Sequence, residues 1–295
     1  MAEMMFDRYI TVDWSASSRP QSGRDSIWIC VLDASDGPFT INPNTRSGAE
    51  VFLRDLLVES VASGRRALVG CDFPYGYPAG FATALQLGEP AWLSVWNYLD
   101  EHVRDGIDNS NNRFDVASEM NGRLSWHAFW GCPDSQHFAH LSARRDNARY
   151  CIAPDMVGLK EWRTVEALLR LRGMQPHSTW KLLGAGSVGS QSLTGIPVLA
   201  RLRRHPELRE FSVIWPFEVV VPDLPDGRPG IVLAEVWPSL IDVPLPPGQV
   251  KDEAQVMCLS AGLRDQDRAG RLPALFAAGD SPLAKEEGWI LGVVP

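Results

Sequence analysis

Residues 66–72 read RALVGCD, an apolar run that ends in an acid, and residues 9–15 (YITVDWS) repeat this design. A third run, residues 231–237 (IVLAEVW), carries Glu235 near its end and is followed by Pro238. Continuous apolar runs without polar alternation are typical of strands covered on both faces, as in parallel or mixed α/β sheets. The three segments therefore predict an α/β protein with helices on both faces of its sheet.

The segments around these runs complete the predicted element order. Residues 25–33 and 38–41 predict two further strands, and residues 47–64 predict a helix with an apolar stripe that ends at a glycine. Later elements are a helix at 161–173, a strand at 210–214 and a final helix at 252–263, whereas the polar segment 108–123 is predicted to be a loop.

Length and composition limit the class of protein. The chain has 295 residues, 45% of them hydrophobic, and a formal net charge of -8. It can bury a sizeable core, and its apolar runs are far shorter than the roughly 20 residues of a membrane span. The five cysteines are an odd number without a C-x-x-C pair, and no basic, then apolar, leader is visible at the start. We therefore expect a cytoplasmic protein without a membrane segment or a disulfide framework.

Acidic residues stand at the ends of the three central runs. Asp13, Asp72 and Glu235 would meet at one edge of the sheet if their strands are neighbours, and Asp252 opens the last predicted helix. Carboxylates gathered without a cation repel one another, whereas Mg²⁺ or Mn²⁺ takes oxygen ligands and offsets their charge. The alternative is that each acid faces water at a strand end and Asp252 only caps its helix.

Several motifs resemble one known family. The stretches VDWS, GCDFP, KLLGAGSVGSQSLTGIP, WPFE, AEVWPS, KDEAQV and EEGWILGV are similar to those of the DUF429 group of predicted nucleases in the ribonuclease H-like superfamily. The resemblance implies a single domain over residues 1–295 with a mixed sheet of about five strands. The first and fourth strands would be adjacent and parallel, and residues 75–209 would form a long, mainly helical insertion between the fourth and fifth strands.

The same resemblance implies a metal-dependent hydrolase of phosphate esters. Asp13 would be the ligand shared by two Mg²⁺ or Mn²⁺ ions, and Asp72, Glu235 and Asp252 would complete the catalytic, metal-binding cluster. The chain departs from related nucleases at Gln255, where a second acid of the last helix would be expected, so the number of ions stays open. The substrate would be a nucleic acid or a nucleotide.

Candidate substrate-binding residues lie in the middle of the chain. Residues 141–210 carry 12 Arg or Lys against 6 Asp or Glu in an otherwise acidic protein. Lys181 and Ser187 flank a loop of small residues that could hold a phosphate, and Arg201 and Arg204 could contact others. A plain turn and a solvated face are the alternatives. The loop contains G-x-G-x-x-G, but a polar segment precedes it and Pro197 is expected to interrupt any following helix, so a dinucleotide site is not predicted.

Two other functions remain open. An ATP-binding relative of the sugar kinase and actin-like branch would want small residues directly after the first acid, where this chain has Trp14. The other alternative, which the family resemblance suggests, is a non-catalytic protein linked to molybdenum-cofactor or cobalamin metabolism. The acidic total charge disfavours bulk duplex binding and favours a single strand, a structured end or a small nucleotide. Oligomeric state is not determined by the sequence.

Overall fold

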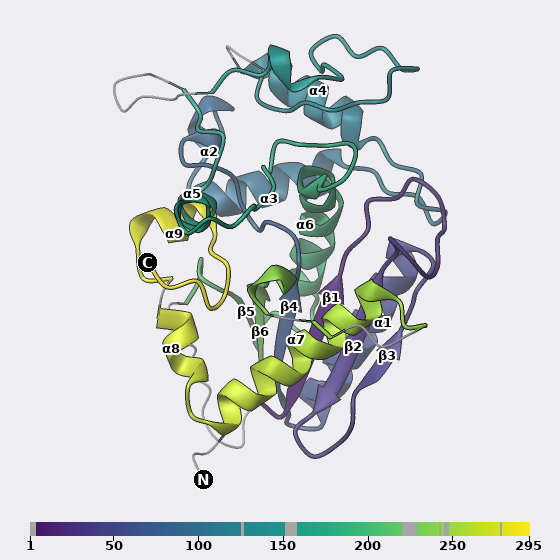
Figure 1. The fold of residues 1–295 in the computed structure, drawn as a ribbon, viewed down its shortest axis with the longest axis vertical. Helices are drawn as coiled ribbons and strands as arrows, with labels where there is room; N and C mark the ends of the chain where they lie inside the picture. The colour runs from purple at the N-terminus through teal and green to yellow at the C-terminus, as the bar shows by residue number, and fades with distance from the viewer. Residues whose placement is uncertain are drawn as a thin grey trace.

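A computed structural model describes residues 4–124, 127–150, 158–219, 229–241, 243–244, 248–277 and 279–295. At its centre lies a six-stranded sheet in the order β3-β2-β1-β4-β6-β5 (Figure 1). The strands are β1 (Arg8–Asp13), β2 (Trp28–Asp33), β3 (Phe39–Ile41), β4 (Arg66–Cys71), β5 (Ser212–Ile214) and β6 (Gly230–Glu235).

The sheet is mixed, as expected. β2 pairs antiparallel with both β1 and β3, whereas β1, β4, β6 and β5 run parallel to their neighbours. The predicted adjacent and parallel placement of the first and fourth strands is confirmed by the pairing of β1 with β4. The described residues form six strands rather than about five, because the short β5 adds an edge beside β6.

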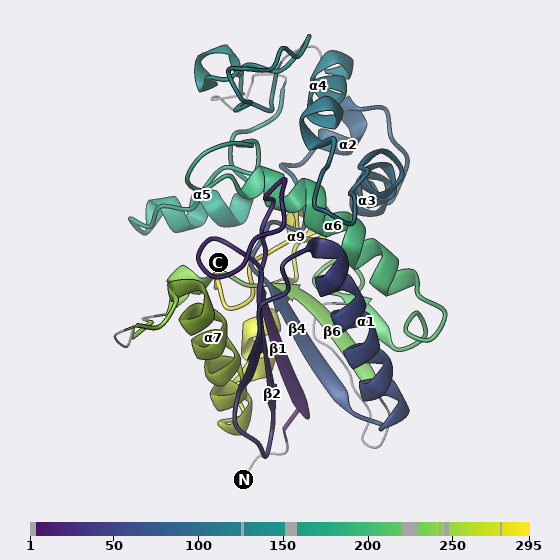
Figure 2. The ribbon, with the colours of Figure 1, turned by 90° about the vertical axis from the view of Figure 1, so that its right-hand side faces the viewer.

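Helices cover both faces of the sheet (Figure 2). On one face, α1 (Arg46–Ala62) and α6 (Val188–Arg204) share a core with residues such as Val12 and Val69. On the other face, α7 (Lys251–Arg268) and α8 (Leu272–Ala277) share a second core with residues such as Tyr9 and Leu68. Alternate strand residues point to opposite faces, so continuous apolar runs are needed to fill both cores.

Where the structure describes it, the segment between β4 and β5 consists of helices joined by long loops. Its helices α2, α3 and α4 gather beyond one end of the sheet (Figure 1). The insertion comprises α2 (Phe81–Ala84), α3 (Ala91–His102), α4 (Arg113–Arg123), the 3-10 turn η1 (Arg145–Asn147), α5 (Thr164–Leu171) and α6; beyond it follow η2 (Pro238–Leu240) and α9 (Pro282–Glu287).

The prediction of a loop over 108–123 is wrong for Arg113–Arg123, which form α4. Phe114, Ala117 and Met120 recur at helical spacing and are buried, and the polar Asn121 is also buried because its amide bonds the backbone around Phe129. The segment is polar in sequence because part of its inner face binds backbone groups instead of packing against apolar side chains.

The expectation that Pro197 interrupts the helix after the small-residue loop is also wrong. α6 runs through Pro197 for 17 residues. Proline removes one helical hydrogen bond, a cost that burial of this helix among apolar side chains offsets. Gly195 permits the close approach, since a Cβ there would lie 2.4 Å from the Phe73 ring. The helix therefore starts at Val188, directly after the loop.

The described cysteines Cys30, Cys71, Cys132 and Cys258 are free thiols, and Cys151 lies outside the described residues. Across the part of the chain that the structure describes, we find no helix with both the length and the apolar character needed to cross a membrane.

Candidate active site

Asp13 and Asp72 lie side by side at the carboxyl ends of β1 and β4. The register pairs Val12 with Cys71, so the next residue on each strand is an aspartate. Thr11 faces α7, since its hydroxyl donates to the Val256 carbonyl oxygen at 2.6 Å, and Asp13, two residues on, points to the same face. The pairing continues beyond the strands, because the Asp72 N–H donates to Val12 O at 3.1 Å.

The two carboxyls are half-buried and perturb each other. Burial raises the pKa of Asp13 well above its ordinary value, and the charges of Asp72 and Asp252 raise it further. Burial also raises the pKa of Asp72 to about 7, although hydrogen bonds from the Trp14 N–H and the Asp13 carboxyl oppose that rise. At neutral pH the pair therefore tends to keep a proton unless a cation replaces it.

Asp252 is close to this pair but is not a third member of it. It lies in the first turn of α7, and its Oδ2 accepts a hydrogen bond from the Asp25 N–H at 2.7 Å. Burial raises its pKa as well. Within the described ranges, no three His, Cys, Asp or Glu side chains are grouped closely enough to hold a metal ion. The expected four-acid cluster is thus reduced to two carboxylates with a third nearby.

The structure does not bring Glu235 into the group, contrary to expectation. The register pairs Glu235 with Cys71 rather than with Asp72, so the side chain leaves the sheet on the opposite face. There it is buried and ion-paired with Arg163, at 2.6 Å from Nη2 to Oε1 and 2.8 Å from Nη1 to Oε2. It also accepts the Tyr75 N–H at 3.0 Å. Its role in this structure is to hold α5 against the sheet edge.

Of the four predicted substrate-binding residues, the structure places some near the acids and others far from them. Ser187 immediately precedes α6 and lines the cleft described below, whereas Lys181 donates to the Ala185 carbonyl and closes the loop on itself. Arg201 and Arg204 lie at the far end of α6, about 20–24 Å along the helix from its start. Both are ion-paired there, chiefly with Asp100, so the structure does not place them at the acids.

A cleft of about 800 Å³ opens over Asp13 and Asp72. The loop after β1, the loop before α6, the 3-10 turn after β6 and the start of α7 form its walls. Residues that line it include Ser15, Ser17, Arg24, Asp25, Arg113, His177, Gly184, Gly186, Ser187, Gln191, Trp237, Asp252 and Gln255. The predicted metal edge therefore lies in a large cleft that is lined by both polar and apolar groups.

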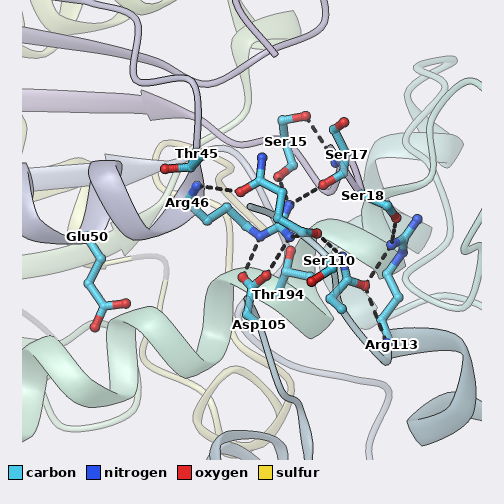
Figure 3. Close-up of polar contacts among 12 residues, drawn as sticks. Ser15, Ser17, Ser18, Thr45, Arg46, Glu50, Asp105, Ser110, Arg113 and Thr194 are labelled. Carbon is cyan, nitrogen blue, oxygen red and sulfur yellow. Dashed lines mark hydrogen bonds and ion pairs between the residues drawn. The ribbon is translucent and has the colours of Figure 1, made fainter. Parts of the chain in front are cut away.

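The loop after β1 is held in place by Arg46 (Figure 3). This buried guanidinium pairs with Asp105 at 2.5 and 2.6 Å and donates through Nη1 to the carbonyl oxygens of Ser15 and Ser17, at 3.1 and 2.7 Å. Trp14 adds a second anchor, since its indole is buried and its Nε1 donates to Thr194 Oγ1 at 3.2 Å. Packing, rather than stacking on a substrate, accounts for Trp14.

Comparison with family models, curated proteins and solved structures produced no match to this chain. Its function must therefore be inferred from the cleft.

Three residues of the cleft were missed by sequence reasoning: Arg113, His177 and Gln191. Gln191 donates to the Trp14 carbonyl oxygen, and His177 lies against Gly186, where a Cβ would sit 2.4 Å from the imidazole ring. Burial lowers the pKa of His177. No local motif marks these residues, because each reaches the cleft from an insertion whose path over the sheet is set by tertiary packing.

Proposed function

We propose that the protein is a divalent-metal-dependent phosphoesterase that acts on a nucleic acid or a nucleotide, built on a ribonuclease H-like sheet. The observation that carries the proposal is the Asp13–Asp72 pair, half-buried on adjacent parallel strands and opening into a cleft of about 800 Å³. The strand order, with β1 antiparallel to β2 and parallel to β4, agrees with the arrangement that the DUF429 resemblance implies.

The chemistry of the pair fits one divalent cation. Burial raises the pKa values of both carboxyls, and the charge of Asp72 raises that of Asp13 further, so the pair gains most from an ion that lets both ionise. Asp13 and Asp72 would hold the ion, and Asp252 adds negative charge nearby. When bound, Mg²⁺ or Mn²⁺ lowers the pKa of a water and stabilises charge on a phosphate oxygen. The pairing of Glu235 with Arg163 argues against a second ion.

The cleft suits a small or unpaired substrate. Its volume lies within the range of roughly 300–1,000 Å³ typical of small-ligand sites. The net charge of -8 opposes binding of a long duplex, whereas Arg113 supplies a buried cation inside the cleft itself. A nucleotide or the end of a single strand fits this balance better than bulk DNA does.

The ATP-binding alternative has less support. Such a site would place small residues directly after the first acid to surround phosphates, but here Trp14 is buried against Phe73 and Thr194. Phosphate contact would then have to begin at Ser15 or beyond.

The test is hydrolysis of labelled single strands, hairpins and nucleotides with Mn²⁺, Mg²⁺ or EDTA. We expect metal-dependent turnover that Asp72→Asn reduces by more than the roughly 10–100-fold cost of an outer-shell change. Asp55→Asn, an exposed carboxylate paired with Arg54 on α1, is the matched control and should retain activity. A folded protein that turns over none of these substrates would refute the proposal. Protection by ATP without cleavage would favour the kinase-like alternative, and neither response a non-catalytic role.

A further inference from the structure

Arg113 is a buried cation without an acidic partner. Only 6% of the residue is exposed, yet it lines the same cleft as Asp13 and Asp72. Its Nη1 donates to Ser18 Oγ at 2.9 Å (Figure 3). Nη1 also donates to Asn111 Oδ1 at 2.7 Å, and Nε donates to Ser190 Oγ at 2.9 Å. Within the described part of the chain, Nη2 has no hydrogen bond and no carboxylate lies within ion-pair distance of the guanidinium.

The neighbouring charges do not balance it. Arg46 lies close enough to lower the pKa of Arg113, and Asp105, which opposes that effect, is already engaged by Arg46 through two hydrogen bonds. The three groups together leave one positive charge. Burial lowers the pKa of Arg113 to about 10, so the guanidinium remains charged at neutral pH. Charges buried to this extent are nearly always paired, which points to an anion that enters from the cleft.

The start of α6 supplies further donors beside this cation. Ser190, which accepts from Arg113, belongs to the first turn of the helix. The N–H groups of Ser187 and Val188 donate no hydrogen bond to any described residue, and no side chain caps the helix. Both residues line the cleft. A 17-residue helix directs its positive dipole end toward this point.

We propose that the guanidinium of Arg113 and the N–H groups of Ser187 and Val188 at the start of α6 form a phosphate-binding subsite in the cleft of Asp13 and Asp72. Only the assignment of that phosphate to the substrate rests on the proposed function. A tetrahedral oxyanion matches the geometry, because a guanidinium offers N–H donors in a planar fork and a helix start offers adjacent N–H groups.

The experiment is calorimetric titration of the full chain with inorganic phosphate in EDTA. We expect Arg113→Gln to weaken phosphate binding about tenfold or more, since hydrogen bonds to a charged group are worth roughly 1.5–3 kcal/mol. Arg113→Lys keeps the charge but loses the fork, and should weaken binding by about threefold or more. The matched control is Arg24→Gln, which removes an exposed arginine of the same cleft that pairs with Asp25, and should change binding by less than about twofold.

Unchanged phosphate binding in either folded Arg113 variant would overturn the subsite, as would an equal loss in Arg24→Gln, which would indicate a diffuse field. Asp72→Asn separates this proposal from the proposed function, because it should abolish hydrolysis and leave phosphate binding intact or tighter. Phosphate binding that depends on Arg113 in a protein without hydrolytic activity would leave the subsite standing and refute only the phosphoesterase. Hydrolysis that is unaffected by Arg113→Gln would leave the phosphoesterase standing and refute the assignment of this phosphate to the substrate.

Discussion

Asp72→Asn should stabilise the metal-free protein, because the Asp13–Asp72 pair costs free energy whenever it ionises. The pKa of Asp72 rises from its ordinary value of 3.8 to about 7 on folding. A difference of roughly three pH units corresponds to about 4 kcal/mol. We take this as an upper limit, since water in the open cleft screens the charges.

The pH dependence follows from the direction of that change. Below about pH 4 both the folded and the unfolded chain carry the proton, so there is no penalty. Between about pH 4 and 7 the unfolded chain releases the proton that folded Asp72 retains, so the free energy of unfolding of the natural protein falls across this window. The asparagine variant cannot titrate at position 72, so this position does not lower its free energy of unfolding across the window.

Urea denaturation followed by tryptophan fluorescence in EDTA, at about pH 4.5 and about pH 8, measures the difference. We expect the variant to gain up to about 4 kcal/mol relative to the natural protein between these two pH values. Mn²⁺ at about pH 8 should then stabilise the natural protein and not the variant. A stability difference that is the same at both pH values would refute the reasoning, because it would mean that burial on folding does not raise the pKa of Asp72.

Three further substitutions test the surrounding architecture. Glu235→Gln should destabilise the fold by about 3 kcal/mol in urea denaturation, because it breaks the buried ion pair with Arg163. Mn²⁺ binding should be unchanged, and loss of Mn²⁺ binding in the folded variant would show that Glu235 belongs to the metal site. Arg46→Met should lower the free energy of unfolding by about 3 kcal/mol and speed amide hydrogen exchange of residues 14–18, because it removes the hydrogen bonds to Ser15 and Ser17. Unchanged protection of residues 14–18 would show that packing alone holds that loop. Gly195→Ala should cost about 1–3 kcal/mol, as its Cβ would overlap the Phe73 ring; an unchanged urea midpoint would show that α6 can shift away.

The elements that were predicted correctly are those with a strong local pattern. The apolar runs that became β1, β4 and β6 each contribute residues to both cores, as strands covered on both faces do. The direction of the Glu235 side chain could not be predicted in this way, because it depends on a strand register that is offset by one residue and that no local sequence pattern indicates. α4 was missed for a similar reason: its polar Asn121 is satisfied only by backbone groups elsewhere in the insertion.

The cleft combines two charge systems that come from different parts of the chain. The sheet contributes Asp13 and Asp72, two buried carboxyls that a bound cation would allow to ionise together. The insertion contributes Arg113, whose uncompensated charge creates a demand for an anion. A phosphate ester bound with a divalent ion meets both demands at once, whereas a neutral ligand would meet neither. The insertion therefore converts a sheet edge that could hold a metal into a site that could also hold a phosphate, which is why Arg113 is as informative about function as the acids are.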